Sequence, residues 1–230
     1  MKKPICIAVF SFLFTLNGFS QRMNIQDYFD NTQGRGALMQ KVGKKETDNA
    51  TGSPYVMNTF AAGNINGVAE MILVKYNAYT DEIELNNGDD KVFILPKDSL
   101  FNTITLRTGS TYKYVTYSDD DNKPVTGYMA EKSSVNGVRL LAKEKIILMP
   151  EKQPVNGYGA YAPAKFERVN DDYYLQLKDN KIVEFPKNKK KLAALFQNQT
   201  AAIDAFFKTN KVSFKDSSDL IRITNFIATL

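Results

Sequence analysis

Short runs of apolar and aromatic residues, separated by turn residues, recur through the middle of the chain. Residues 68–76 form a largely apolar run that favours a buried strand, whereas residues 81–85 alternate acidic and aliphatic side chains, as in a half-exposed strand. Further strands are predicted at residues 91–95, 103–107, 111–117, 125–131, 138–149, 165–169, 173–177 and 182–185. Strands this short and closely spaced indicate an antiparallel meander, curled into a sandwich-like sheet or an open barrel.

Turn residues punctuate these strands. Asn-Gly pairs, which accept the positive φ angles of tight hairpins, begin at Asn66, Asn87, Asn136 and Asn156. Alternation along residues 111–117 places Tyr112 and Tyr114 on one face and Val115 and Tyr117 on the other. Another hairpin is predicted to join residues 165–169 and 173–177. Residues 150–163 contain several Pro and Gly and are expected to form a long loop or crossover.

The periodicity becomes helical after Pro186. Two or three short amphipathic helices are predicted, with Thr200 capping one and Ser217 or Ser218 capping the last. Their apolar stripes consist of Leu192, Leu195, Phe196, Ile203, Phe206, Phe207, Leu220, Ile223, Phe226 and Ile227. Helices this short need packing partners, so we expect residues 186–230 to pack on a β-rich domain at residues 53–185. The predicted fold class is α+β: mainly antiparallel β, followed by short C-terminal helices.

The first twenty residues have the three-part layout of a secretory signal peptide. Lys2 and Lys3 precede an apolar run from residue 5 to 16, and Gly18 and Ser20 supply the small side chains that a signal peptidase requires before Gln21. A retained membrane anchor is the alternative, but the run has about twelve residues where a spanning helix needs about twenty. We therefore expect residues 1–20 to be cleaved and residues 21–52 to form a weakly ordered N-terminal arm.

Cysteine and histidine usage restricts the chemistry. The single cysteine, Cys6, lies inside the expected signal peptide, and the chain contains no histidine. The mature protein would therefore be cysteine-free and lack disulfides, Cys or His ligands for metals, and Ser-His-Asp or Cys-His catalytic sites. We expect no cofactor.

The weak net charge of the mature chain argues against nucleic acid as a partner. Without Lys2 and Lys3 the chain carries 28 basic against 25 acidic residues, a net charge of +3. This weak excess differs from the clustered excess of a nucleic-acid binder. Tryptophan, the usual stacking platform for sugars, is absent. No second long apolar segment follows the signal, so the mature chain is expected to have no transmembrane helix.

Several strings occur in one order along the chain: residues 52–55, 75–84, 163–166, 172–175 and 189–192, followed by Phe196. Together they resemble a group of uncharacterised exported proteins from Bacteroidota, over roughly residues 52–227. The group carries no assigned activity. The resemblance therefore implies only an exported compartment, periplasmic or extracellular, and a single-unit architecture.

Two acidic turns offer oxygen ligands of the kind that calcium takes. Residues 119–122 include Asp119 and Asp121, the candidates for a metal site. The run lacks the glycine and the distal glutamate of an EF-hand loop, so an exposed hairpin turn is the favoured interpretation. Residues 170–172 receive the same interpretation.

Three other groups are candidate sites. Glu82 and Glu84 alternate on one strand face about 6–7 Å apart, the spacing of some glycosidase carboxylate pairs, although exposed glutamates do the same. The basic residues 187 and 189–191 could touch anionic head groups or simply begin a solvated helix. Tyr158 and Tyr161, within residues 150–163, are the weak candidates for ligand binding, or they cover a sheet edge.

Three function classes remain open from the sequence. The leading one is a non-catalytic envelope or secreted protein that binds a macromolecular partner or a lipid-like ligand. A carboxylate-dependent hydrolase and a structural surface component without a small ligand are the alternatives. A hydrolase should show two convergent carboxylates in a pocket, whereas a binding protein should show an exposed apolar patch or a lined cavity.

Overall fold

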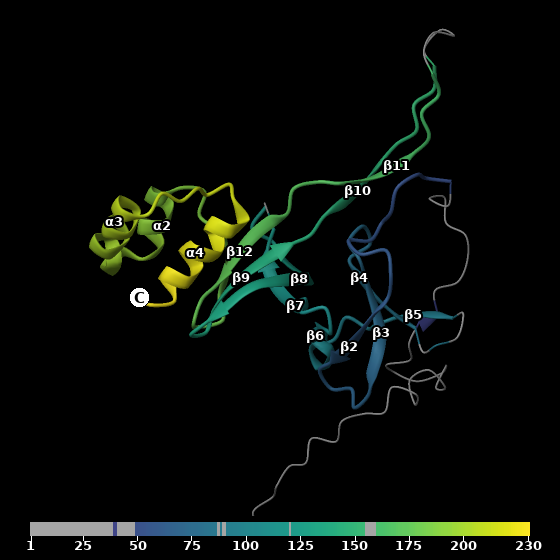
Figure 1. The fold of residues 1–230 in the computed structure, drawn as a ribbon, viewed down its shortest axis with the longest axis horizontal. Helices are drawn as coiled ribbons and strands as arrows, with labels where there is room; N and C mark the ends of the chain where they lie inside the picture. Colours follow the sequence, from purple (N-terminus) through teal and green to yellow (C-terminus); the bar gives the residue numbers. More distant parts are fainter. Residues whose placement is uncertain (1–38, 41–48, 87, 89–90, 120, 155–159) are drawn as a thin grey trace, which may run out of the picture.

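The computed structural model describes residues 39–40, 49–86, 88, 91–119, 121–154 and 160–230. The expected signal peptide and most of the expected N-terminal arm lie outside these residues, and of the arm only residues 39–40 and 49–52 are described. Figure 1 shows a long curled sheet, a layer of helices at one end of it, and a two-stranded hairpin that projects from the body.

Eleven antiparallel strands form the main sheet, in the order β1-β5-β4-β3-β2-β6-β7-β8-β9-β12-β13. The bounds are β1 Met39–Gln40, β2 Ala61–Ile65, β3 Met71–Asn77, β4 Glu82–Asn86, β5 Val92–Ile94, β6 Thr103–Leu106, β7 Thr111–Ser118, β8 Pro124–Val135, β9 Val138–Lys143, β12 Asp172–Gln176 and β13 Ile182–Glu184. A short 3-10 helix, Ser99–Phe101, carries the chain from β5 across to β6 beside β2.

The sheet curls in opposite directions in its two halves. One face of β2–β8 encloses the largest core, which includes Val74, Ile83 and Tyr112. The opposite face of β7, β8, β9, β12 and β13 encloses a smaller core around Met129, Leu141 and its partly buried neighbours. β13 lies against β7 although three strands separate them in the sheet order. The C-terminal half therefore bends away from the face that the N-terminal half encloses.

Strand β8 belongs to both halves. It pairs with β7 along its first part and with β9 along its second, and its register with β9 shifts between Glu131 and Ser133. Such a bulge bends a strand and increases its twist, which allows the sheet to change its direction of curl there. Tyr128, Met129 and Ala130 are all buried, because both faces of the sheet are covered at this point.

The helices cover the C-terminal half of the sheet. They are α2 Lys189–Leu195, α3 Thr200–Thr209 and α4 Ser217–Ile227, with a 3-10 turn Gln197–Gln199 between the first two. α4 packs on β8 and β9, and its Leu220, Ile223 and Ile227 share a core with Leu140 and Leu175. The predicted caps were wrong: Gln199 precedes α3 without a side-chain cap, and Asp216 caps α4 by accepting a hydrogen bond from the Asp219 amide.

Two strand predictions also need correction. The run 138–149 is two strands, β9 and β10 (Ile146–Met149), because Glu144 and Lys145 separate them. Residues 165–177 do not form a hairpin: β11 (Lys165–Arg168) pairs with β10, whereas β12 pairs with β9 and β13. The three turn residues permitted a hairpin but did not require one. Each strand pairs instead with an apolar strand earlier in the chain, β11 with β10 and β12 with β9.

The fold class is α+β, mainly antiparallel β followed by short C-terminal helices, as the sequence predicts. The predicted faces of β7 are also confirmed, since Tyr112 and Tyr114 lie in the larger core and Val115 and Tyr117 in the smaller one. The Asn-Gly turn between β8 and β9 has φ angles of 47° at Asn136 and 81° at Gly137, which is the conformation that this pair tolerates best.

Candidate functional site

The element that extends farthest from the body is the hairpin β10–β11, called the projecting hairpin and comprising residues 146–154 and 160–168. Its strands pair from Ile146 opposite Arg168 to Met149 opposite Lys165. A further pair of backbone hydrogen bonds joins Lys152 and Ala162. Figure 1 shows this ribbon running away from the sheet. The residues expected to form an irregular loop therefore include paired backbone.

The base of the projecting hairpin is fixed to the body. Ile146 and Phe166 are buried in the larger core, and the Phe166 ring contacts the Tyr79 ring edge-on at 5.2 Å. The backbone of Thr51 forms hydrogen bonds with Ala164 and Phe166. Gly52, with φ of 80°, follows at a point where a Cβ atom would lie 2.5 Å from the Phe166 carbonyl oxygen. The hairpin therefore leaves the body in a defined direction.

Beyond this base, apolar side chains of the projecting hairpin face solvent. Ile147, Met149 and Tyr161 have exposed fractions of 40, 37 and 52 %. Ile147 and Met149 are two residues apart on β10 and so share the face opposite to buried Ile146. The Tyr161 hydroxyl donates a hydrogen bond of 3.0 Å to Glu151 across the ribbon, and this bond raises the pKa of Tyr161.

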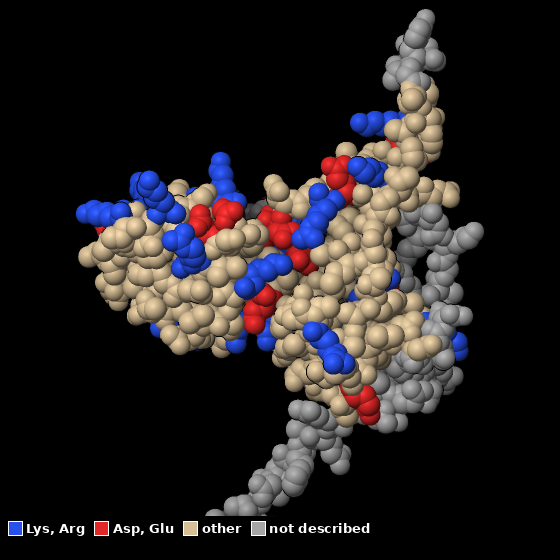
Figure 2. Space-filling model, in the orientation of Figure 1, with Lys and Arg blue, Asp and Glu red and all other residues tan. Residues whose placement is uncertain are grey.

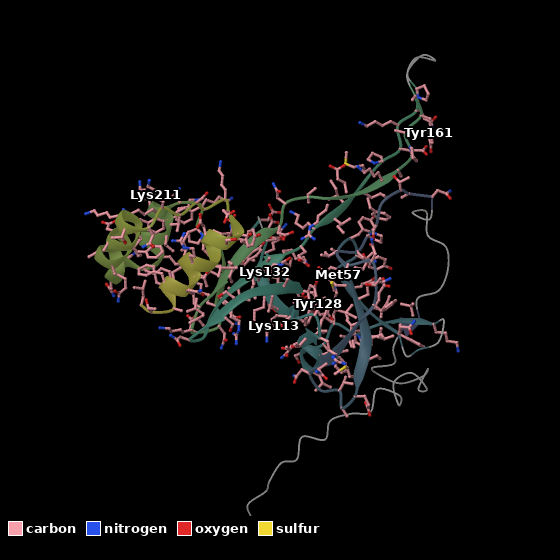
Figure 3. All side chains as sticks on the ribbon, in the orientation of Figure 1. Met57, Lys113, Tyr128, Lys132, Tyr161 and Lys211 are labelled. Carbon is pink, nitrogen blue, oxygen red and sulfur yellow. The ribbon has the colours of Figure 1, made fainter. Side chains whose placement is uncertain are left out.

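Of the two tyrosines that the sequence offers as candidates for ligand binding, the structure describes one. Tyr161 lies on the projecting hairpin, and Figure 3 shows it far from the body. Tyr158 lies outside the described residues. Tyr161 does not cover an edge of the main sheet, so that alternative is not supported for it.

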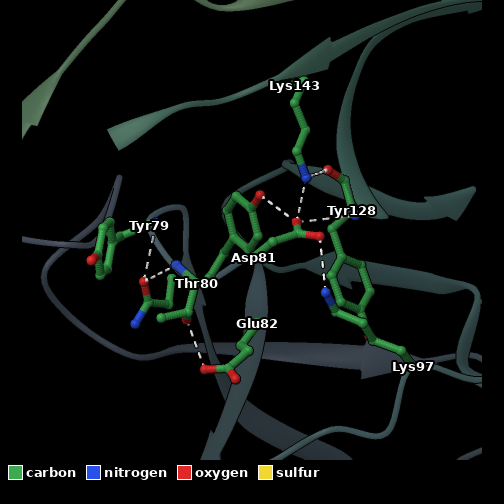
Figure 4. Close-up of polar contacts among 9 residues, drawn as sticks. Tyr79, Thr80, Asp81, Glu82, Lys97, Tyr128 and Lys143 are labelled. Atoms are coloured by element: carbon green, nitrogen blue, oxygen red, sulfur yellow. Dashed lines mark hydrogen bonds and ion pairs between the residues drawn. The ribbon is translucent and has the colours of Figure 1, made fainter. Parts of the chain in front are cut away.

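A half-buried polar cluster joins the two halves of the sheet near the start of β4 (Figure 4). The carboxylate of Asp81, in the turn between β3 and β4, accepts hydrogen bonds from the Tyr76 hydroxyl at 2.9 Å and the Tyr128 amide at 3.2 Å. It also forms ion pairs with Lys143 on β9 and with Lys97. Lys143 in turn donates to the Tyr128 carbonyl at 3.1 Å.

The local backbone makes room for this cluster. Asp81 has a positive φ of 57°, which aspartate tolerates better than most residues and which turns its carboxylate towards β8. A Cβ atom at Gly127 would lie 2.7 Å from the Asp81 Oδ2 atom and 2.9 Å from the Lys143 amine. Desolvation lowers the pKa of Lys143, while Asp81 opposes that change. Because four donors already occupy the Asp81 carboxylate, the cluster suits a structural connection better than acid–base chemistry.

A second carboxylate, this one buried, lies where β9 leads into the projecting hairpin. Glu144 is 4 % exposed and accepts a hydrogen bond of 3.0 Å from the Tyr112 hydroxyl. Lys132 and Arg168 form ion pairs with it at 3.0 and 3.5 Å. The rings of Tyr76 and Tyr112 lie 4.8 Å apart, so an aromatic contact links the Asp81 and Glu144 clusters. Burial, and then the adjacent carboxylates, raise the pKa values of both tyrosines.

Neither cluster is predicted from the sequence. One signal was present: the charged run 143–145 interrupts an otherwise apolar region. Charged residues within a predicted buried strand require partners. Sequence alone does not identify those partners, because Asp81 lies 62 residues from Lys143.

Glu84 is not the exposed glutamate that strand alternation predicted. It is 1 % exposed and accepts hydrogen bonds from the Tyr55 hydroxyl at 3.0 and 3.1 Å and from the Asn77 side chain at 3.2 Å. Residues before β2 cover this part of the sheet, and there the Lys75 amine lies 3.7 Å from the centre of the Tyr55 ring. Glu82 accepts instead from Thr80 at 2.7 Å. The two carboxylates therefore have separate partners.

The aspartates of the two acidic turns interact with residues in or beside their own turns. Asp119 accepts hydrogen bonds from the amides of Asp121 and Lys123 at 3.0 and 2.8 Å, and Asp121 pairs with the Lys123 amine. In the other turn, Asp171 pairs with Arg168. Within the described residues, no group of three or more acidic side chains could hold a metal ion. Asp119 and Asp121 are therefore explained by their turn.

Among the hollows in the described surface are three larger ones, of about 570, 530 and 580 Å³. The first and third each contain two carboxylates, and all four are engaged. Asp171 pairs with Arg168, Asp216 caps α4, Asp119 accepts from its own turn, and Glu184 pairs with Lys187. The second hollow is lined largely by Asn and Thr between the β2–β3 turn and β6. None of the three has the two unoccupied, convergent carboxylates expected of a hydrolase.

None of the helices in the described part of the chain has the length and apolarity needed to span a bilayer. No family model matches the chain, and neither a curated protein nor a solved structure shows significant similarity to it.

Proposed function

We propose that the chain is an exported, non-catalytic protein of the bacterial envelope or the extracellular space, and that it binds a macromolecular partner through the projecting hairpin. The observation that carries the proposal is the exposure of Ile147, Met149 and Tyr161 on an element that leaves the body of the molecule. Export rests on the arrangement of the first twenty residues.

The physics of a two-stranded ribbon supports this role for the hairpin. An isolated hairpin has little stability in water, because its backbone is solvated on both edges and its side chains bury little area. The outer part of the projecting hairpin has no core of its own among the described residues. A partner that covered Met149 and Tyr161 would remove apolar surface from water, at about 25 cal/mol per Å². It could also add a strand to an open edge of the ribbon.

The proposal of a non-catalytic protein is supported by the hydrogen bonds and ion pairs that already engage its most buried carboxylates. Asp81 and Glu144 each accept a hydrogen bond from one tyrosine hydroxyl and pair with two cations, and Glu84 accepts from Tyr55 and Asn77. A general base needs a free lone pair directed at its substrate. The lining of the hollows is also rich in polar groups, which favours a macromolecular partner over a lipid-like ligand.

The test compares two double variants that introduce the same charges. Met149→Asp with Tyr161→Asp alters the hairpin, and Met71→Asp with Leu100→Asp alters exposed apolar residues elsewhere. Envelope and medium fractions of the producing cells are analysed by native electrophoresis. We expect the wild type and the control to migrate as a complex and the hairpin variant as a monomer, with equal melting temperatures. A complex that survives in the hairpin variant would contradict the proposal.

Export is tested on the same material. Intact-mass analysis should give a chain that begins at Gln21. A protein that still carries Met1 would contradict the exported assignment without bearing on the hairpin.

A further inference from the structure

The net charge of the chain is concentrated in its helical segment. Residues 186–230 contain eight Lys and Arg against three Asp, a net charge of +5. The whole chain has 30 basic and 25 acidic residues, so the remaining 185 residues are neutral overall. The charge that the composition attributes to the whole protein therefore belongs to the helical layer over one end of the sheet.

Part of this charge converges between α2 and α3. The Lys189 amine pairs with Asp204 at 2.7 Å, and Lys208 lies one turn beyond Asp204 on α3. Residues four apart on a helix lie on the same side of it, so Lys208 neighbours Asp204, and both lysines lower the pKa of that carboxyl. Lys190 follows Lys189, and Lys211 follows the end of α3. We call Lys189, Lys190, Lys208 and Lys211 the lysine rim.

The rim is open to solvent. Figure 2 shows Lys and Arg side chains along the outer edge of the helical layer, and Figure 3 shows Lys211 on that layer. Lys190, Lys208 and Lys211 are exposed, and among the described residues none of their amines forms an ion pair within 4.0 Å. Among the described residues, Asp204 is therefore the one carboxylate that forms an ion pair with a lysine of the rim.

We propose that the lysine rim holds the protein reversibly against the surface of an anionic phospholipid bilayer. This inference goes beyond the proposed function, since it uses the opposite end of the molecule from the projecting hairpin. A polybasic patch gains free energy beside an anionic leaflet through the negative surface potential, which needs no fitted pocket. The attraction decays over about 8–10 Å at ordinary salt, so several exposed lysines act together.

The composition of the rim favours a bilayer over a nucleic acid. The rim contains lysines alone, which act as mobile point charges, whereas arginine provides the planar fork suited to defined phosphates. The one arginine of the segment, Arg222, is paired with Asp219. The nearby rings do not offer a platform for bases, because Phe206 stacks on Phe226 and Phe207 on Phe214, all half-buried.

The test uses residues 21–230 and sedimentation with two kinds of vesicle, phosphatidylcholine alone and phosphatidylcholine mixed with phosphatidylglycerol. We expect binding to the mixed vesicles only, and loss of that binding as salt is raised. In Lys190→Glu, Lys208→Glu, Lys211→Glu the partition coefficient should fall by at least about a hundredfold, since each lysine near an anionic leaflet contributes about fivefold.

The matched control places the same charge change elsewhere on the surface. Arg107→Glu, Lys178→Glu, Lys181→Glu alters three exposed cations outside the helical segment and should bind within a fewfold of the wild type. Equal loss in both triple variants would overturn the proposal, because net charge alone would then explain binding. Binding to a soluble acidic polysaccharide but not to mixed vesicles would also overturn it. Neither result bears on the hairpin.

Discussion

The amine of Lys143, near the end of β9, pairs with the carboxylate of Asp81 in the turn between β3 and β4. The two residues belong to different halves of the sheet, which curl in opposite directions. Their side chains are only 15 and 20 % exposed, so the pair is largely removed from water. It therefore fixes the angle between the halves as well as contributing to stability.

Removing Asp81 should cost more than removing Lys143. In Asp81→Ala the Lys143 amine loses its carboxylate partner and keeps only the Tyr128 carbonyl, whereas in Lys143→Met the carboxylate keeps Tyr76, Lys97 and the Tyr128 amide. We expect Asp81→Ala to lower the free energy of unfolding by about 2–4 kcal/mol, somewhat less than the 3–5 kcal/mol of a fully buried pair, because both side chains keep some exposure to water.

The measurement is urea unfolding of both variants beside an exposed control. Lys123 and Asp121 form an ion pair with side chains 72 and 73 % exposed, so Asp121→Ala should cost less than about 1 kcal/mol. Equal costs for Asp81→Ala and Asp121→Ala would show that the cluster does not join the halves.

A glycine should be required at position 127 because the Asp81 carboxylate occupies the space that a side chain would need. The Cβ atom of Gly127→Ala would meet the carboxylate at 2.7 Å, so the Asp81 cluster must shift or break. We expect a cost of about 1–3 kcal/mol in the wild-type background and a much smaller one in Asp81→Ala. A double-mutant cycle by chemical unfolding measures this difference. Strictly additive costs would mean that the clash lies elsewhere.

Alkaline pH should unfold the protein through its buried tyrosines. The pKa values of Tyr76, Tyr112 and Tyr128 are all raised, mainly by burial, above the ordinary value of 10.0. The folded protein therefore holds the hydroxyl protons of these tyrosines more tightly than the unfolded chain does. Stability is therefore fully present below about pH 10 and is lost as pH rises above it. Lys143, whose pKa is lowered, acts in the opposite direction.

Urea midpoints measured from pH 7 to 12 should stay level and then fall above about pH 10. Phenolate absorbance of these tyrosines should appear together with unfolding. Rapid titration of all tyrosines in the folded protein would contradict their burial.

The sequence predicted the strands of the sheet well and the long-range connections poorly. Alternation assigned Tyr112 and Val115 to opposite faces correctly, because a regular strand has only two faces. It failed at Glu84, which a segment before β2 covers, and cover by a separate segment leaves no periodic signal. Both strands of the projecting hairpin lie within predicted strands, at residues 138–149 and 165–169, but their pairing was not predicted, since Pro and Gly in residues 150–163 indicated a loop or crossover.

Helix packing can be tested at one isoleucine and one phenylalanine. Ile203 is fully buried, while Phe206 is half-buried and stacks on Phe226 with ring centres 4.2 Å apart. Ile203→Ala should cost about 2–5 kcal/mol, and Phe206→Ala less than the 3–5 kcal/mol of a fully buried ring. If residues 186–230 belong to the same cooperative unit as the sheet, calorimetry should show one transition in both variants. Two separate transitions would place the helices in their own unit.

The most direct measurement of the central claim, that the projecting hairpin contacts a partner, is site-specific crosslinking in producing cells. A photoreactive amino acid replaces Met149 on the hairpin or, as the control, Met71 on β3, whose side chain is more exposed than that of Met149. After irradiation, the Met149 position should give a discrete heavier band of defined composition, and the Met71 position should remain monomeric. A crosslink from Met71 alone, or none from Met149, would contradict the assignment of the hairpin as the binding element.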